Sequence, residues 1–267
     1  MNRRVWSVLS RPVAMAREAM AATLFPQACR VCGVMVGSWD DGVACRDCWR
    51  CIEAILERTD HCVKCGLRLP KLPRANPPEG RRCGACETMA FVSARACGPH
   101  EGALRESVLW LKKYPWISPG LQKLIERACL EIPAGGRLDS ILPVPLHATR
   151  LAERSFNQAE VVARVVASFT GLPLDTLSLI RIKQTERHRL GMGAAERSRS
   201  LARAFAVRAP RLIADRRLLL VDDVLTTGCT ADEIARTLLA HGAREIHLLT
   251  ISRKGLNRQE RKEPKGY

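Results

Sequence analysis

Two kinds of hydrophobic spacing alternate along the second part of the chain. Residues 101–113 (EGALRESVLWLKK) place apolar side chains three and four positions apart, and residues 121–130 repeat this spacing after Pro119. The run DSILPVPL at residues 139–146 is instead short and apolar, and it ends in a loop marked by prolines. The pattern therefore predicts two helices followed by a buried strand.

The alternation continues toward the C-terminus. Ser155 or Asn157 can start a helix over the apolar run AEVVARVVASF, because both are residues that cap helix N-termini. The run RRLLLVDDV at residues 216–224 predicts a buried strand, residues 230–240 a helix, and residues 244–252 another apolar strand. Strand, helix and strand at this spacing indicate a parallel sheet, so the fold class is α/β.

The segment LLLVDDVLTTGCTA at residues 218–231 joins two acids to small and hydroxyl residues. We expect Asp222 and Asp223 to emerge at the end of the strand, where ligands gather in open parallel sheets. The acids would repel a bare phosphate, but they suit ribose hydroxyls or a Mg²⁺ ion that bridges to phosphate. The segment therefore predicts a sugar-phosphate site. Five residues can offer N–H groups and hydroxyls to the phosphate at a helix N-terminus: Thr226, Thr227, Gly228, Cys229 and Thr230.

Two other interpretations of the acid pair use the same letters. The acids can cap the following helix and complement its dipole. They can also belong to a Walker B strand for ATP hydrolysis, but that needs a phosphate loop of the GxxxxGK[ST] type, which the sequence does not contain.

Cysteine divides the chain into two parts. Ten of the twelve cysteines lie between Cys29 and Cys97, and eight of them form four CxxC pairs. Without an export signal this pattern indicates metal rather than disulfides. Two thiolates separated by two residues can hold one tetrahedral zinc ion, and a second pair completes the four-sulfur shell. The predicted ligands of two structural zinc ions are Cys29, Cys32, Cys45, Cys48, Cys62, Cys65, Cys83 and Cys86.

The assignment of these ligands to sites has alternatives. Sequential sites are simplest, but interleaved sites that join the first pair to the third are also possible. Cys51 and His61 lie close enough in sequence to replace a ligand, although we expect that neither of them binds the metal. A redox CxxC would need a thioredoxin-like context that is absent here. No ligand position is left open for catalysis, so both ions are expected to be structural.

The chain carries 43 Lys and Arg against 27 Asp and Glu, a formal charge of +16. This excess favours phosphates, nucleotides, nucleic acid or an acidic protein as partners, although an evenly basic surface has the same composition. The N-terminal apolar run is broken before it reaches the length of a signal peptide, and no run suits a membrane span. We therefore expect a soluble, cytoplasmic protein, with a weak amphipathic helix over residues 3–20 as an alternative.

Composition predicts four segments. Residues 1–24 form an N-terminal helix or extension, and residues 25–90 form a cysteine-rich double zinc ribbon. Residues 91–253 form the α/β domain, and residues 254–267 form a basic tail that is expected to be disordered.

The letters VDDVLTTGCT resemble the signature of type I phosphoribosyltransferases, the loop that holds the 5-phosphate of phosphoribosyl pyrophosphate (PRPP). A longer pattern is more specific: the CxxC pairs, then LKKYPW, then PVPLHATRLAERSFNQAEVVA, then VDDVLTTGCT. From about Cys29 to Ser252 this order resembles the competence protein ComF family, which is also described as amidophosphoribosyltransferase-like. The resemblance implies a parallel-sheet phosphoribosyltransferase domain behind a double zinc ribbon.

The resemblance also implies roles for single residues. Asp222 and Asp223 would contact the ribose hydroxyls, directly or through Mg²⁺, as the catalytic residues. The residues from Thr226 to Thr230 would hold the 5-phosphate. Arg150 and Arg154 would be candidates for the pyrophosphate, with Asn157 and Gln158 closing the loop, although surface arginines beside a helix start explain the same letters.

Residues 181–205 occupy the position of the mobile loop that covers the active site in this family. Relatives usually carry T-x-x-Q-x-x-L and then Arg and Asn. Here Thr185 is followed by His188, and Ser200 or its neighbour replaces the Asn. The familiar RGFNQ is RSFNQ, with Ser155 in place of glycine. These departures leave the acceptor substrate undefined, and His188 fits an exposed loop histidine better than a general base.

Two classes of function follow. In the first, the chain is an enzyme or sensor that binds PRPP with Mg²⁺, and pyrophosphate leaves the anomeric carbon as an unidentified acceptor attacks. In the second, which the resemblance to ComF supports, the chain is a DNA-uptake component. Its zinc ribbons and basic surface would then hold single-stranded DNA or a competence helicase, although few aromatic residues lie between the knuckles to stack on bases.

Overall fold

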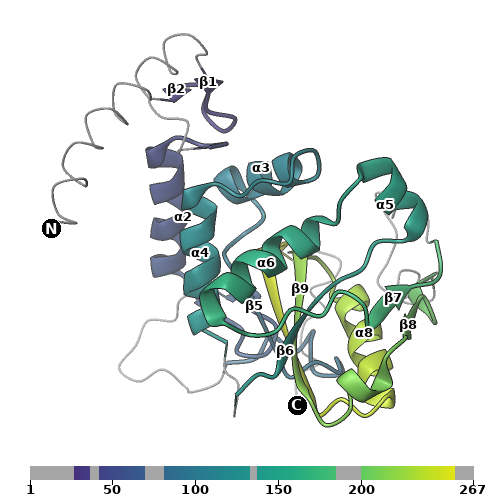
Figure 1. Cartoon of the computed structure of the whole chain (residues 1–267). Coiled ribbons are helices and arrows are strands. Elements are labelled where there is room, and N and C mark those ends of the chain that lie inside the picture. The colour runs from purple at the N-terminus through teal and green to yellow at the C-terminus, as the bar shows by residue number, and fades with distance from the viewer. Residues whose placement is uncertain (1–26, 37–41, 70–80, 133–136, 185–199, 256–267) are drawn as a thin grey trace, which may run out of the picture.

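The computed structural model describes residues 27–36, 42–69, 81–132, 137–184 and 200–255. Its centre is a sheet of four parallel strands in the order β5, β10, β9, β6 (Figure 1). The sheet and its covering helices confirm the predicted α/β class. These strands are β5 (Ser93–Ala96), β6 (Ser140–Pro143), β9 (Arg217–Leu225) and β10 (Glu245–Arg253).

Alternation along β9 places apolar side chains on both faces of the sheet. Leu218 and Leu220 belong to one buried cluster, and Leu219 and Val221 belong to the other. Both faces must therefore be covered, which is why this strand reads as a continuous apolar run.

Helices cover the two faces of the sheet (Figure 1). On one face lie α3 (Gly102–Leu111), α4 (Pro119–Leu130) and α6 (Gln158–Thr170). On the other lies α8 (Cys229–Ala240). The Asn157 side chain accepts the Ala159 N–H, so Asn157 rather than Ser155 is the N-cap of α6.

The cysteine-rich segment packs directly on this sheet domain. It contains α2 (Arg46–Arg58) and two short antiparallel hairpins: β1 (Gln27–Ala28) with β2 (Met35–Val36), and β3 (Asp60–His61) with β4 (Arg68–Leu69). Its first half joins the buried cluster of α3, α4 and α6, and its second half joins the cluster of α8. The elements of the ribbons thus share cores with the sheet domain.

A smaller unit lies beyond the sheet, on the right of Figure 1. It consists of α5 (Ala148–Arg154), the antiparallel pair β7 (Leu179–Arg181) and β8 (Phe205–Val207), and a single 3₁₀ turn at Pro210–Leu212. Hydrophobic spacing predicts none of these elements, because each is short and lies largely at the surface.

None of the described helices has the length and apolarity to cross a membrane. The expectations for residues 1–24 and for the tail beyond residue 255 lie outside the described residues, as do Thr185 and His188 of the predicted mobile loop.

Candidate functional site

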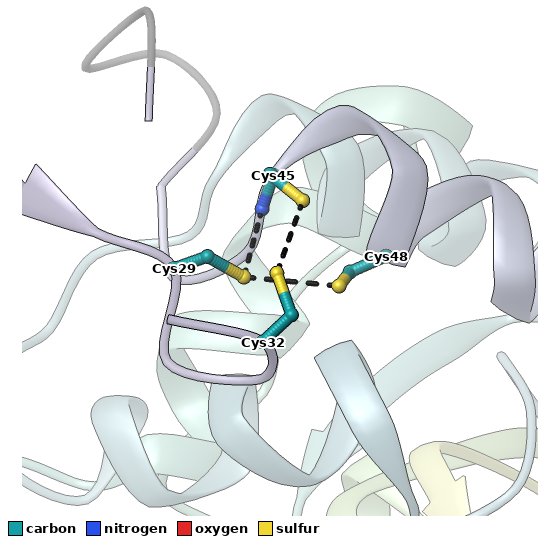
Figure 2. Close-up of side chains that lie close together, drawn as sticks. All are labelled: Cys29, Cys32, Cys45 and Cys48. Atoms are coloured by element: carbon teal, nitrogen blue, oxygen red, sulfur yellow. Dashed lines mark hydrogen bonds between the residues drawn. The ribbon is translucent and has the colours of Figure 1, made fainter. Parts of the chain in front are cut away.

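Four cysteines meet where the β1–β2 hairpin faces the start of α2 (Figure 2). The sulfur atoms of Cys29 and Cys48 are 3.8 Å apart, and those of Cys32 and Cys45 are 3.7 Å apart. Four sulfurs bound about 2.3 Å from one tetrahedral zinc ion are separated by about 3.8 Å. The first cluster therefore has the size and donor set of a zinc site.

The second cluster has the same geometry. The sulfur atoms of Cys62 and Cys86 are 3.6 Å apart, and those of Cys65 and Cys83 are 3.4 Å apart. The pairing is thus sequential, as in the simplest alternative, and not interleaved. Cys51 and His61 belong to neither of the four-cysteine groups found in the described chain.

Each cluster contains one thiol that ionises easily. Burial opposes ionisation of Cys29, but the backbone hydrogen bonds that it accepts outweigh burial and lower the pKa of this thiol to about 6. A hydrogen bond with Cys65 lowers the pKa of Cys62 to about 4. Backbone N–H groups that point at sulfur stabilise thiolates, which are the form that binds metal.

The acid pair lies inside a strand and not after it, which corrects the sequence-based expectation. β9 continues to Leu225, because β10 remains beside it to the pairing of Arg253 with Leu225. β6 stops earlier, at Pro143 opposite Val221. The β6 side of β9 is therefore open from Asp222 onward, and the Asp223 carboxylate accepts a hydrogen bond from Gln158 at the start of α6.

The two carboxylates of the pair are in different environments. Burial, and after it the charge of Asp223, raise the pKa of Asp222 well above its ordinary value. The Asp222 carboxylate accepts the backbone N–H of Asp223 at 2.8 Å. Two close, poorly hydrated carboxylates repel each other, so a bound cation or a set of hydroxyl donors would relieve a real electrostatic cost.

A polar chain connects Asp223 to two basic residues. The Gln158 side chain, at the start of α6, donates to the Asp223 carboxylate at 3.4 Å, and Arg154 of α5 donates to the side-chain oxygen Oε1 of Gln158. From the other side, the Lys112 ammonium lies 3.8 Å from Asp223. Lys112 belongs to the LKKYPW motif, to which the sequence alone assigns no role. The structure thus joins three separate sequence motifs at one carboxylate.

The loop after β9 turns into α8 through Gly228. This residue has φ +88°, a left-handed conformation that suits glycine, and α8 begins at the next residue. The backbone N–H groups of Thr227 and Gly228 bond to no acceptor within the described ranges. The first N–H groups of any α-helix also lack helical partners. The N–H groups of Thr227 and Gly228 are therefore available to an anion.

The Gly228→Ala variant is expected to lower the free energy of unfolding by more than about 1 kcal/mol, because an alanine there is strained and its Cβ would meet Met89 Cε at 2.8 Å. Urea unfolding measures the loss. Gly242→Ala is the matched control, since Gly242 has φ +86° but an added Cβ would find its nearest neighbour, Ala214, at 3.6 Å. Equal losses in the two variants would show that the Met89 contact has no effect.

Arg150 and Arg154 lie on α5, so the region expected to be a loop is a short helix. Ser155 ends this helix with φ +66°. A left-handed residue at this position explains why the related motif carries glycine there. Asn157 donates to the Val144 carbonyl at 3.0 Å besides capping α6, so its side chain already serves the fold.

Arg181 of β7 was not singled out from the sequence. Burial lowers its pKa first, followed by the nearby charge of Arg150, while Asp222 acts in the opposite direction. These electrostatic neighbours place the Arg181 guanidinium in the same basic and acidic environment as the candidate site. A pattern of spacing could not reveal it, because β7 is only three residues long.

Residues 133–266 match the phosphoribosyl transferase domain model. The DNA utilization protein YhgH of Salmonella typhimurium is 29% identical over 215 residues, which cover 77% of this chain and 89% of that protein. Competence protein F of Haemophilus influenzae is 32% identical over 142 residues, which cover 52% of this chain and 62% of that protein.

Two solved structures are also similar in part. The allosteric regulatory enzyme of purine biosynthesis is 20% identical with a TM-score of 0.32, covering 49% of this chain and only 25% of that enzyme. Purine phosphoribosyltransferase from Pyrococcus horikoshii is 11% identical with a TM-score of 0.26, covering 61% of this chain and 93% of that protein. These low scores carry no argument, so the site rests on its own geometry and on the family match.

Proposed function

This chain belongs to the phosphoribosyl transferase domain family and to its ComF branch, and we propose that it binds PRPP, or a related ribose 5-phosphate, together with Mg²⁺. One observation carries this proposal: two carboxylates on β9 are followed, within a few residues of the chain, by free backbone N–H donors before α8. One half of the arrangement suits ribose hydroxyls and a cation, and the other half suits a phosphate.

The acid pair also fits Mg²⁺ chemically. Carboxylate oxygens are preferred ligands of this ion, and a nearby positive charge would favour the ionised form of Asp222, whose pKa is raised by burial and then by Asp223. The ion would neutralise charge on the diphosphate. Asp222 and Asp223 hold the ribose, Thr226 to Thr230 hold the 5-phosphate, and Arg150 and Arg154 lie near the diphosphate end. Asn157 supports this arrangement by positioning the start of α6.

If transfer occurs, the C1–O bond to pyrophosphate breaks, pyrophosphate leaves with the electron pair, and an acceptor bonds to C1. The acid pair would stabilise the positive charge that develops on the ribose ring. The acceptor is not part of the proposal.

Isothermal calorimetry of PRPP with and without Mg²⁺ tests this proposal on the zinc-loaded chain. We expect saturable binding of one PRPP per chain that weakens at least about tenfold without Mg²⁺, because the acid pair would then repel the diphosphate. Ribose 5-phosphate is the control for the phosphate loop alone. Absence of heat at millimolar PRPP in both conditions would reject the proposal.

Two structural zinc ions are part of the same proposal, supported by the sulfur separations of both clusters. A cytoplasmic location goes with them, because a reducing compartment keeps eight thiols available for metal. The names of the two relatives from Salmonella and Haemophilus favour a link to DNA uptake or use.

A second function, binding of single-stranded DNA, is favoured by an aromatic cavity beside the first ribbon. The cavity has a volume of about 600 Å³ and is lined by Trp110, Tyr114, Trp116 and Arg30, among others. The Trp110 and Tyr114 rings are 4.2 Å apart, and the Arg30 guanidinium lies 4.6 Å from the Trp110 ring centre. Aromatic rings beside a cation are a typical surface for unpaired bases. A competence helicase is the alternative occupant of this cavity. In that case the chain would show no affinity for DNA.

Substituting Trp116 or Tyr114 by alanine is expected to weaken oligodeoxythymidine binding about tenfold each, since stacking on one base contributes about 1–3 kcal/mol. Both side chains are more than 40% exposed, so the fold should tolerate the change. Fluorescence anisotropy at two salt concentrations measures the affinity. Phe169→Ala is the matched control, because Phe169 is 42% exposed on α6 and does not line the cavity. Equal affinities in all variants would reject the cavity as a DNA site.

A further inference from the structure

The second cysteine cluster and the phosphate loop share one buried arginine. Arg253, the last residue of β10, is only 5% exposed. One terminal nitrogen of its guanidinium donates to the Thr226 carbonyl at 2.7 Å, and the other lies 3.6 Å from the Cys65 sulfur. The loop that starts after β9 is therefore connected through a single side chain to a predicted zinc ligand.

Further contacts hold the segment after Cys86 against α8. The Ala90 N–H donates to the Asp232 carboxylate at 2.6 Å, and Arg236 donates to the Thr88 carbonyl at 2.9 Å. The Met89 side chain packs over Gly228, where a Cβ atom would lie 2.8 Å from Met89 Cε. The segment after Cys86 thus contacts the first two turns of α8 and the loop before it.

The first cluster has no comparable contact. Its neighbours are α3 and α4: Trp49 packs on Gly120, and Gly42 packs on Ser118. Across the described parts of the chain, no hydrogen bond or ion pair joins Cys29, Cys32, Cys45 or Cys48 to residues 226–230. Each cluster consists of four cysteines, but only the second contacts the loop before α8. The first cluster therefore serves as an internal control for the effect of zinc loss on this loop.

The contact with Arg253 depends on the charge of sulfur. Four thiolates around one Zn²⁺ carry net negative charge, so a guanidinium beside Cys65 makes a charge-assisted hydrogen bond. A neutral thiol is a weak acceptor, and the four sulfurs would separate without the ion. Arg253 would then lose the Cys65 partner of one terminal nitrogen, a contact that helps to hold the other terminal nitrogen on the Thr226 carbonyl.

We propose that Arg253 is a positioning residue that fixes the phosphate loop to the second metal centre, so that loss of zinc there weakens sugar-phosphate binding while loss of zinc at the first centre does not. The consequence for sugar-phosphate binding rests on the function proposed above; the consequence for the loop does not. The chain would thereby couple its metal content to ligand binding through one side chain.

A matched pair of variants separates the two centres. Cys83→Ser removes a ligand of the second centre that does not contact Arg253, and Cys32→Ser removes a ligand of the first. Each variant is expected to contain one zinc per chain. Hydrogen exchange of residues 224–231, measured without ligand, should become at least about tenfold faster in Cys83→Ser and stay within about twofold in Cys32→Ser. Equal exchange in both variants would overturn the proposal.

Substitution of the arginine tests the contact itself. Arg253→Met should keep two zinc ions, speed exchange of residues 224–231 about tenfold, and leave exchange of α6 unchanged. Arg253→Lys keeps one donor group and should recover part of the loss, which a residue that only fills space would not do. The proposal is wrong if the two variants behave alike or if Arg253→Met exchanges like the wild type.

Ligand affinity provides the last measurement. Arg253→Met and Cys83→Ser should bind Mg²⁺ and PRPP about tenfold more weakly than Cys32→Ser does. If the wild type binds no PRPP, the proposed function fails, but the exchange data still decide the role of Arg253. If Cys83→Ser exchanges rapidly throughout α6, its fold is lost, and the two Arg253 variants decide.

Discussion

The Asp222→Asn, Asp223→Asn double variant is expected to bind PRPP in Mg²⁺ at least about 100-fold more weakly than the wild type, while its ligand-free fold becomes more stable. The affinity falls because amides cannot replace two charged ligands of a divalent ion. The stability rises because burial and carboxylate repulsion raise the pKa of Asp222, so the folded chain resists its ionisation. The free energy of unfolding of the ligand-free variant should therefore exceed that of the wild type at neutral pH.

The raised pKa also sets the direction of the pH dependence. The unfolded chain ionises Asp222 at the ordinary carboxyl pKa, and the folded chain ionises it only at higher pH. Between these two pKa values the folded state binds more protons, so the contribution of Asp222 to stability decreases as pH rises. Affinity for Mg²⁺ should increase over the same range, because the ion needs the carboxylate.

Thermal unfolding with and without Mg²⁺ and PRPP measures both effects together. The wild type should show a ligand-induced increase in Tm, whereas the double variant should start from a higher Tm and show none. Asp47→Asn is the control, since Asp47 is an exposed acid on α2. A double variant that still gains stability from the ligand would contradict the assignment of the acid pair.

Removal of zinc is expected to lower the Tm by more than about 10 °C. Between residues 27 and 69, apart from the undescribed residues 37–41, the ribbons consist of two-residue strands and one helix, and buried Cys29, Cys62, Cys65 and Cys86 belong to their cores. Structural zinc contributes about 10–16 kcal/mol of apparent binding energy in zinc-finger peptides, and this binding energy is coupled to folding. Because both ribbons share cores with the sheet domain, the effect should extend to the sheet.

Metal analysis of the purified chain and unfolding in a zinc chelator test this expectation. Two zinc ions per chain are expected, and one in the Cys62→Ser variant. Cys51→Ser is the matched control, because Cys51 is an exposed cysteine of α2 outside both clusters. A chain that contains less than one zinc ion, or whose Tm does not change in chelator, would contradict the metal assignment.

Sequence spacing predicted the parts of this molecule that follow periodic rules. The apolar run before Asp222, the cap at Asn157 and the four CxxC pairs each depend on residues close together in the chain, and the structure places them as expected. The position of the acid pair within β9 was not predictable, because it depends on how far β10 and β6 extend beside that strand.

Contacts between segments that are far apart in the chain could not be predicted from the sequence either. The aromatic residues of LKKYPW meet Arg30 of the first ribbon only after folding, so the few aromatic residues between the knuckles gave no sign of the cavity. Lys112 of the same motif reaches Asp223, and Arg253 reaches Cys65 across 188 positions. Such contacts follow from the packing of the ribbons on the sheet and not from local pattern.

A crystal structure of the zinc-loaded chain with Mg²⁺ and PRPP would test the central claim most directly. The account predicts the 5-phosphate on the backbone N–H groups of residues 226–230 and the ribose hydroxyls, with or without an intervening ion, on Asp222 and Asp223. PRPP bound at another surface, or a phosphate loop that stays empty at saturating ligand, would contradict it.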